Sequence, residues 1–172
     1  MEMFVPDMYQ QSIYTINYKK LKKKGIKCLL FDLNNTIAGY EVDYPDNKLR
    51  ELMFEIEKDF KVIILSNSSK NRVRPFKEKL NIDSAFKARK PFKKKYKKIM
   101  NVYGFKDSQI AVIGDMLLTD ILGGNKMGFT TILVNGISEE EPFHVRLVRI
   151  FERRIIKKLN DKGILFKGKY YE

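Results

Sequence analysis

The sequence predicts an α/β fold of the Rossmann-like kind, with three α/β/α layers built around a mostly parallel sheet. Short apolar runs alternate along the chain with longer segments of helical periodicity, which is typical of parallel strands joined by helices. Polar side chains follow several of these runs, where the carboxyl ends of parallel strands form a ligand-binding edge. With 172 residues, 44% of them hydrophobic, the chain is expected to form one domain over residues 1–172.

The first elements are indicated by a buried-strand run and a helix start. Residues 27–32 are expected to form a strand because Cys28–Phe31 is continuously apolar. Pro45–Asn47 is a helix-start signal, and apolar residues at helical spacing carry that helix through residues 51–59. The apolar run at residues 62–65 then predicts the second strand.

The middle of the chain continues the alternation. A helix is expected over residues 70–80, weakened or kinked by Pro75. A short strand is expected over residues 85–88. The helix predicted for residues 91–103 has Pro91 at its first position, where a missing N–H costs nothing.

The last core elements are a strand, a helix and a strand. Residues 110–113 are expected to be a strand, and residues 117–126 a helix that Gly128 stops. The run at 130–134 predicts the final strand, so the core is expected to cover residues 27–135.

Two basic segments flank this core. Residues 1–26 are expected to form an N-terminal arm that ends in a lysine-rich helix closed by Gly25. Residues 142–160 are expected to form a basic amphipathic helix. Its apolar stripe consists of Phe143, Leu147, Ile150, Phe151, Ile155 and Leu159, and its basic residues are Arg146, Arg149, Arg153, Lys157 and Lys158. We favour packing of the stripe on the core, with contact to an anionic membrane as the alternative.

The cysteine, histidine and charge content of the chain limits the kinds of site and partner that it can have. The single cysteine, Cys28, and the single histidine, His144, cannot assemble a Cys/His zinc site, and no disulfide framework is possible. No apolar run approaches the roughly 20 residues of a membrane span, and no signal peptide is visible, so a cytoplasmic location is expected, with peripheral contact to the inner membrane surface as a refinement. The net charge of +13 indicates either anionic partners or a lysine-rich composition with solvated faces. The anionic partners would be phosphorylated substrates, a membrane surface or, on charge alone, nucleic acid.

Four successive strand ends carry polar or charged side chains that are chemically compatible. They are, in chain order, Asp32 and Asn34, Ser66 and Asn67, Lys90, and Asp115 and Asp120. Clustered carboxylates repel one another unless a hard cation lies between them, and oxygen ligands suit Mg²⁺. A lysine and a hydroxyl beside such a cation can hold a phosphoryl group, and Asp32 can attack phosphorus as a nucleophile. The set therefore predicts a phosphoryl-transfer site.

These residues resemble the motifs of the haloacid dehalogenase (HAD) superfamily, and more narrowly the YqeG family of subclass IIIA phosphatases. The resemblance rests on four motifs and on further matches over about residues 4–135. The motifs are Asp32-Leu33-Asn34-Asn35-Thr36, Leu65-Ser66-Asn67, Arg89-Lys90-Pro91 and Gly114-Asp115-Met116-Leu117-Leu118-Thr119-Asp120. The family implies a HAD core and a phosphatase. Since relatives in fungi and plants dephosphorylate phosphatidylglycerophosphate, that lipid is a candidate substrate.

The resemblance also implies a role for each site residue. Asp32 is the implied nucleophile and a Mg²⁺ ligand, with the main-chain carbonyl of Asn34 and the carboxylate of Asp115 as further ligands. Asp120 supports the metal shell. Ser66 and Asn67 belong to the implied substrate-binding turn, Ser66 holding the phosphoryl oxygens, while Lys90 balances charge.

Asn34 departs from the family pattern. The family has an aspartate here that acts as general acid and base, and an amide cannot transfer protons in that role. The change fits either a weakened or repurposed family member or an engineered variant. A catalytically retired module that binds RNA, ribosomal particles or an anionic membrane surface is therefore the alternative to an impaired phosphatase.

The spacing of the motifs leaves no room for a cap domain. The residues between Thr36 and Ser66, and those between Asn67 and Lys90, are each used up by one helix, a loop and a strand. A site without a cap is expected to be open, which suits a phosphate presented on a lipid head group or a macromolecule.

Overall fold

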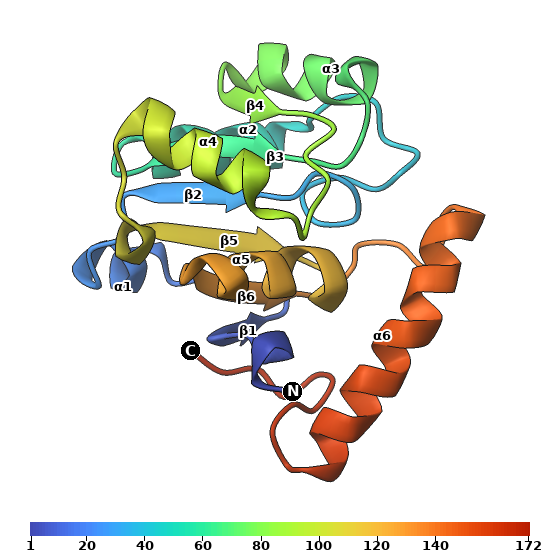
Figure 1. Cartoon of the computed structure of the whole chain (residues 1–172). Coiled ribbons are helices and arrows are strands. Elements are labelled where there is room, and N and C mark those ends of the chain that lie inside the picture. Colours follow the sequence, from blue (N-terminus) through green and yellow to red (C-terminus); the bar gives the residue numbers. More distant parts are fainter.

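The computed structural model describes residues 1–172 and contains one six-stranded parallel sheet with helices on both faces (Figure 1). The strand order is β1-β6-β5-β2-β3-β4, and every neighbouring pair is parallel. The strands are β1 (Met8–Gln10), β2 (Cys28–Phe31), β3 (Lys61–Leu65), β4 (Asp83–Ala85), β5 (Ile110–Gly114) and β6 (Thr130–Val134). The predicted α/β class is confirmed.

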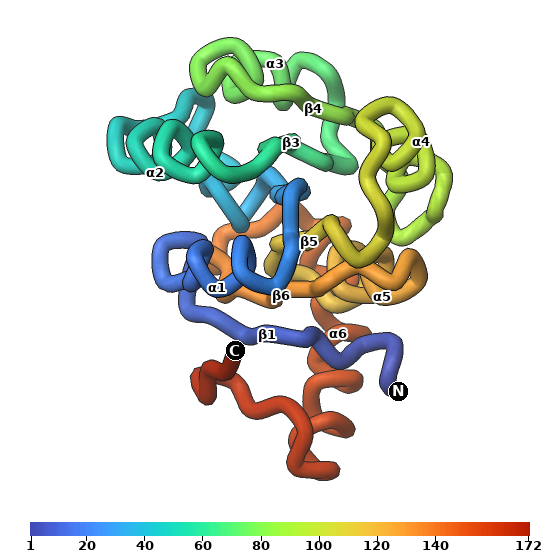
Figure 2. The backbone as a smooth tube through the Cα atoms, turned by 90° about the vertical axis from the view of Figure 1, so that its left-hand side faces the viewer, coloured from blue at the N-terminus to red at the C-terminus, as the bar shows by residue number.

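Helices α1, α2 and α3 cover one face of the sheet, and α4 and α5 cover the other (Figure 2). The helices are α1 (Tyr18–Lys23), α2 (Asn47–Glu57), α3 (Lys70–Leu80), α4 (Lys93–Tyr103), α5 (Leu122–Met127) and α6 (Phe143–Asp161). Short 3₁₀ turns lie at Glu2–Phe4 and Asp107–Gln109, and a π-helical turn at Leu117–Ile121 precedes α5. The side chain of Asp46 caps α2 and that of Ser69 caps α3.

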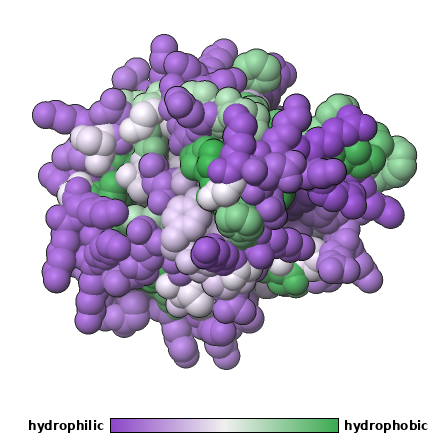
Figure 3. Space-filling view, turned by 90° about the horizontal axis from the view of Figure 1, so that it is seen from below, coloured by the Kyte–Doolittle hydropathy of each residue, from purple (hydrophilic) through white to green (hydrophobic).

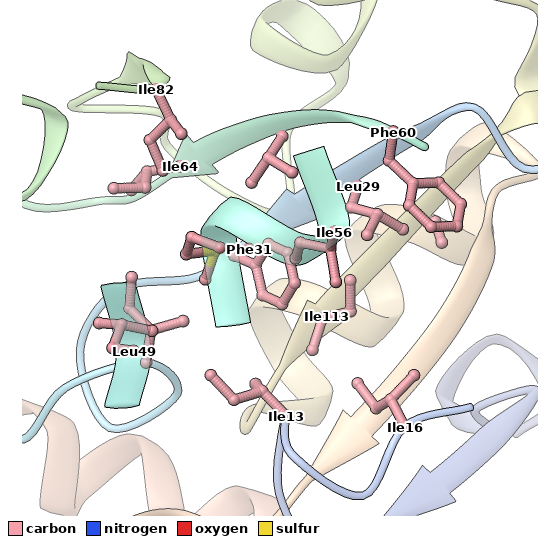
Figure 4. Packing of buried hydrophobic residues seen from close by; sticks show 14 of the residues in the cluster. Ile13, Ile16, Leu29, Phe31, Leu49, Ile56, Phe60, Ile64, Ile82 and Ile113 are labelled. Atoms are coloured by element: carbon pink, nitrogen blue, oxygen red, sulfur yellow. The ribbon is translucent and has the colours of Figure 1, made fainter. Parts of the chain in front are cut away.

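The sheet is buried on both faces, as the continuous apolar runs predict. Because successive strand residues point to opposite faces, Leu29 and Phe31 of β2 join the large core cluster, whereas Cys28 and Leu30 join the second cluster beneath α4. Figure 4 shows the large cluster, with Phe31 packed beside Ile56 of α2. Burial of β2 on both sides fixes the position of the residues that follow it.

Two predictions around residue 90 were wrong in detail. The strand expected at 85–88 ends at Ala85, because Lys87 and Arg89 take positive φ angles of 45° and 56°, which a strand cannot contain. The next helix begins at Lys93, not Pro91, because Phe92 is still extended. Residues 86–92 are therefore a loop, and it carries Lys90.

Two predicted helices also differ from expectation. The helix containing Pro75 runs unbroken as α3, because its buried face (Val73, Phe76 and Leu80) anchors it to the core despite the missing N–H. The helix expected at 117–126 is divided into the π-helical turn and α5, and Gly128 ends it with a φ of 75°, as predicted.

The N-terminal arm contributes more than was predicted. Besides the lysine-rich helix α1, it forms the edge strand β1, which pairs with β6, Tyr9 opposite Leu133. The backbone of Tyr9 also exchanges two 2.9 Å hydrogen bonds with Tyr171, so the C-terminal tail covers this edge. A strand of three residues is too short to show periodicity in the sequence.

Helix α6 lies beyond the carboxyl ends of the central strands, at the right of Figure 1. Its inward face is formed by Val145, Glu152 and Leu159, which are all buried. The preferred interpretation, in which the predicted apolar stripe packs on the core, holds for its C-terminal end and is wrong for the rest. Four stripe residues are exposed: Phe143, Leu147, Ile150 and Phe151. No helix is long and apolar enough to cross a bilayer.

Candidate active site

Three predicted site residues lie at the ends of neighbouring strands in the middle of the sheet. Asp32 follows β2, Ser66 follows β3 and Asp115 follows β5. Strand β2 pairs with both β3 and β5 in parallel register, so their carboxyl ends form one edge. The edge predicted from the order of motifs is therefore present.

Asp32, Asp115 and Asp120 form an acidic cluster at this edge. Each offers a carboxylate oxygen, and the three atoms all lie within 4.8 Å of one another. The π-helical turn supplies Asp120, whose carboxylate accepts hydrogen bonds from the main-chain N–H of Met116 (3.3 Å) and from a neighbouring threonine. Gly114 is required because a Cβ atom there would collide with the Asp120 carboxyl group.

Lys90 is buried against the acidic cluster. Its Nζ atom lies 2.6 Å from one oxygen of Asp32 and 2.6 Å from one oxygen of Asp120. The Asn67 side chain accepts a 2.7 Å hydrogen bond from the Lys90 N–H and donates a 3.3 Å bond to the Lys90 carbonyl. Asn67, predicted to bind substrate, thus uses its amide to fix the loop that carries Lys90.

The pKa values of these groups follow from burial and from one another. Burial raises the pKa of Asp32 to about 7, although Lys90 beside it acts to lower it. Burial likewise raises the pKa of Asp115 to about 6, against the opposing effect of Arg149. For Lys90 burial acts to lower the pKa, but Asp120 and Asp32 outweigh it and raise the pKa, so the lysine stays charged.

Two hydroxyl groups lie at the same edge. The Thr36 hydroxyl donates to one oxygen of Asp115 at 3.0 Å and lies 3.4 Å from an oxygen of Asp32. Ser66 is buried, and its Oγ accepts a 3.1 Å hydrogen bond from the Ser68 N–H. Thr36 therefore orients two members of the acidic cluster, and Ser66 is held in the turn after β3.

The side chain of Asn34 is held by two neighbours. Its Oδ1 accepts a 2.9 Å hydrogen bond from Nε of Arg72, and its Nδ2 donates a 2.7 Å bond to Oγ of Ser68. Arg72 also donates to the carbonyls of Gly39 and Val42. Asn34, the position at which the resemblance implies an aspartate, is thus part of a network that joins the loop after β2 to the start of α3.

Arg149 is the site residue that sequence reasoning missed. It donates a 2.9 Å hydrogen bond to the Asp115 carbonyl, and its guanidinium forms an ion pair with the Asp115 carboxylate. The same guanidinium lies 2.7 Å from Glu141 and 2.8 Å from Glu152. Burial acts to lower the pKa of Arg149, but the carboxylates, Asp115 first, raise it. In the sequence it is one of several basic residues in an amphipathic helix.

The acidic cluster has the donor set of a hard cation. Two carboxylates at adjoining strand ends and one from the π-helical turn supply only oxygen, which suits a hard divalent ion and not a soft metal. Carboxylates buried within 4.8 Å of one another repel unless positive charge lies beside them. Lys90 and Arg149 supply part of that charge, and a bound cation would add to it. Asp32, Asp115 and Asp120 can therefore hold a metal.

Comparison with known proteins finds a matching family model and related chains. A family model described as HAD-hydrolase-like matches residues 87–146. The chain is 38% identical over 163 residues to "Probable phosphatase YqeG" of Bacillus subtilis, covering 94% of this chain and 95% of that protein. It is 27% identical to the chloroplastic/mitochondrial phosphatidylglycerophosphate phosphatase 1 of Arabidopsis thaliana, covering 95% of this chain and 50% of that protein.

A solved HAD-like family hydrolase from Porphyromonas gingivalis has a similar fold. Its TM-score is 0.55 at 11% identity, and the match covers 73% of this chain and 98% of the other. The family model and the Bacillus relative define a phosphatase of the HAD class, which acts on a phosphorylated substrate. The match over nearly the whole of both proteins narrows the assignment: the chain belongs to the YqeG family.

Proposed function

We propose that this protein is a Mg²⁺-dependent phosphomonoesterase in which Asp32 attacks phosphorus. The observation that carries the proposal is the gathering of oxygens from Asp32, Asp115 and Asp120 within 4.8 Å, with Lys90 Nζ 2.6 Å from Asp32. A nucleophilic carboxylate needs neighbouring positive charge to approach an anionic phosphoryl group. Lys90 supplies one such charge, and a cation held by the acidic cluster would supply more.

Each site residue has a role in this proposal. Asp32 and Asp115 would hold the cation together with the main-chain carbonyl of Asn34, and Asp120 would support that shell while its carboxylate holds Lys90. Ser66 binds the phosphoryl oxygens from the turn after β3. When bound, Mg²⁺ neutralises charge that develops on the transferring group.

The proposed reaction has two displacement steps. A carboxylate oxygen of Asp32 forms a bond to phosphorus as the bond to the leaving oxygen breaks, and the departing alkoxide takes a proton from water. Water then cleaves the aspartyl-phosphate, which releases inorganic phosphate and restores the carboxylate. Asn34 can neither donate the first proton nor activate the water, so both steps are slow by about 10²–10⁴-fold.

We further propose phosphatidylglycerophosphate as the substrate. The Arabidopsis relative is named for that lipid, and this chain spans half of that protein's length. No cap domain is inserted between the motif-bearing strands to enclose a small metabolite. A phosphate carried on a lipid head group suits such a site.

The test is Mg²⁺-dependent phosphate release by this chain and by its Asn34→Asp and Asp32→Asn variants. The substrates are p-nitrophenyl phosphate and phosphatidylglycerophosphate in detergent micelles. Asn34→Asp is expected to gain about 10²–10⁴-fold, with Asp32→Asn as the blank. If all three proteins remain at the blank level on both substrates, the catalytic proposal is wrong.

A second candidate is a retired member that binds RNA, a ribosomal particle or another polyanion. Asn34 and the net charge of +13 favour it. This candidate predicts tight, strongly salt-dependent binding of polyanions that is unchanged by Asp32→Ala. Binding that is weak at physiological salt would exclude it.

A further inference from the structure

Helix α6 presents a face to solvent that is both apolar and basic. We call it the outer face and define it by four apolar and five basic residues. They are Phe143, Leu147, Ile150 and Phe151, with Arg146, Arg153, Arg154, Lys157 and Lys158, and all nine are exposed. Figure 3 shows hydrophobic side chains among hydrophilic ones where the helix projects at the right of the view.

The outer face has no partner within the chain. The opposite side of the helix, with Val145, Glu152 and Leu159 at seven-residue spacing, is the side that meets the core. Phe143 is 70% exposed and Phe151 is 58% exposed. Large apolar side chains gathered at this exposure on one helix indicate an interaction surface.

Its charge pattern identifies the partner. The only acidic residue between Phe143 and Asn160 is Glu152, which points inward and forms an ion pair with Arg149. The outer face thus combines aromatic and aliphatic side chains with positive charge alone, as in helices that lie in the plane of an anionic bilayer. A nucleic acid would use the charges and leave the apolar residues exposed to water.

The helix is joined to the candidate active site. Arg149 lies on α6 and contacts Asp115 of the acidic cluster, while Glu152 accepts a 2.8 Å hydrogen bond from the N–H of Leu118. A cavity of about 760 Å³ lies between the helix and the body, and its lining includes Asp115, Arg149 and Arg146. Arg146 belongs both to the outer face and to the lining of this cavity, so the two adjoin at that residue.

We infer that the outer face of α6 docks on an anionic lipid bilayer and so holds the candidate active site one helix diameter, roughly 10 Å, from the membrane surface. The inference deepens the proposed function, on which its link to a lipid substrate rests. The docking itself requires no turnover. The helix would lie on the bilayer with its apolar side chains among the acyl chains and its arginines and lysines at the head groups.

The test is co-sedimentation with vesicles of phosphatidylcholine, with and without phosphatidylglycerol, neither containing substrate. The full chain is expected to bind the anionic vesicles. Leu147→Ser/Phe151→Ser should weaken binding by roughly tenfold or more, because both side chains lose their burial in lipid. Arg146→Gln/Arg154→Gln should weaken it by a similar factor.

The matched control is Phe54→Ser/Val102→Ser, which removes from α2 and α4 two apolar side chains that are more exposed than Leu147 and Phe151. This control is expected to bind like the unmodified chain, and unchanged unfolding temperatures would show that all variants are folded. Binding that survives Leu147→Ser/Phe151→Ser, or that is absent from anionic vesicles, overturns the inference.

Two further outcomes would assign the outer face to another partner. Capture of polyuridylate without vesicle binding, lost only in the arginine variant, would indicate nucleic acid. A concentration-dependent dimer, dissociated by Leu147→Ser/Phe151→Ser and unaffected by vesicles, would indicate a second copy of the chain. Both overturn the lipid inference.

The docking inference and the proposed function fail separately. If the chain binds vesicles but releases no phosphate, even with Asn34→Asp, only the proposed function is wrong. Hydrolysis of phosphatidylglycerophosphate in micelles without vesicle binding would sink only the docking inference.

Discussion

Lys90 and Arg149 both bring positive charge to the same acidic cluster, but from different parts of the chain. Lys90 comes from the loop after β4 and contacts Asp32 and Asp120 at 2.6 Å. Arg149 comes from α6 and contacts Asp115, but it is also paired with Glu141 and Glu152. Lys90 thus faces the proposed nucleophile, whereas Arg149 holds a helix onto the site. The first should govern catalysis and the second stability.

The largest effect is expected from Lys90→Met. It removes the positive charge next to Asp32, so the phosphoryl group would approach an uncompensated carboxylate. Mg²⁺-dependent phosphate release should fall by about 10²–10³-fold, measured in the Asn34→Asp background for sensitivity. Lys94→Met, at an exposed position on α4, is the matched control and should keep full activity. Equal losses in both variants would contradict the role assigned to Lys90.

A smaller effect, on folding stability, is expected from Arg149→Met. The change leaves the buried carboxylates of Asp115, Glu141 and Glu152 without their shared cation. The free energy of unfolding, measured by urea denaturation without metal, should fall by about 3 kcal/mol. Arg153→Met, one turn further along the helix and exposed, should change it little. If Arg149→Met is neutral, α6 is not held by this ion-pair cluster.

The smallest effect is expected from added Mg²⁺ and depends on pH. The folded-state pKa values of Asp32 and Asp115, about 7 and about 6, lie above those of an unfolded chain. Without metal, the protonated Asp32 and Asp115 therefore contribute to the free energy of unfolding at about pH 4. This contribution is lost as the pH rises through 6 to 7. A cation competes with those protons. Mg²⁺ should stabilise the fold by about 2–3 kcal/mol near pH 8 and by less near pH 5.

Thermal unfolding at both pH values, with and without Mg²⁺, measures this difference. Asp115→Asn should abolish most of the Mg²⁺ effect, because it removes one of the three clustered carboxylates. Stabilisation by Mg²⁺ that is the same at both pH values, or the same in Asp115→Asn, would show that the ion binds elsewhere.

The part of the site that lies on the sheet was predictable from the sequence. Asp32, Ser66 and Asp115 follow apolar runs, and parallel strands necessarily bring such residues to one edge. The placement of Lys90 on the same edge follows from the loop after β4, although the strand itself ends three residues earlier than expected. Here the local sequence and the geometry of a parallel sheet place these residues at the same edge, so no further tertiary contact has to be known.

The contribution of α6 was not predictable in the same way. Helical periodicity identifies an apolar stripe but does not say which side of a helix meets the core. Glu152 and Arg149 occupy the inward side through ion pairs, and Phe143 and Phe151 remain outside. Glu141 and Asp115, the ion-pair partners of Arg149, can be identified only from the tertiary contacts. The edge strand β1 was not predicted for a different reason: it is only three residues long.

The central claim is that Asp32 becomes phosphorylated during turnover. The most direct measurement is acid quenching of this chain with substrate and Mg²⁺, followed by mass spectrometry of the peptide that contains Asp32. With p-nitrophenyl phosphate, whose leaving group departs without a proton from a general acid, Asn34 slows mainly the second step, because it cannot activate water. A phosphoryl adduct should therefore accumulate on Asp32, and it should be much weaker in Asn34→Asp. Mg²⁺-dependent phosphate release without any adduct on Asp32, or with the adduct on another residue, would contradict it.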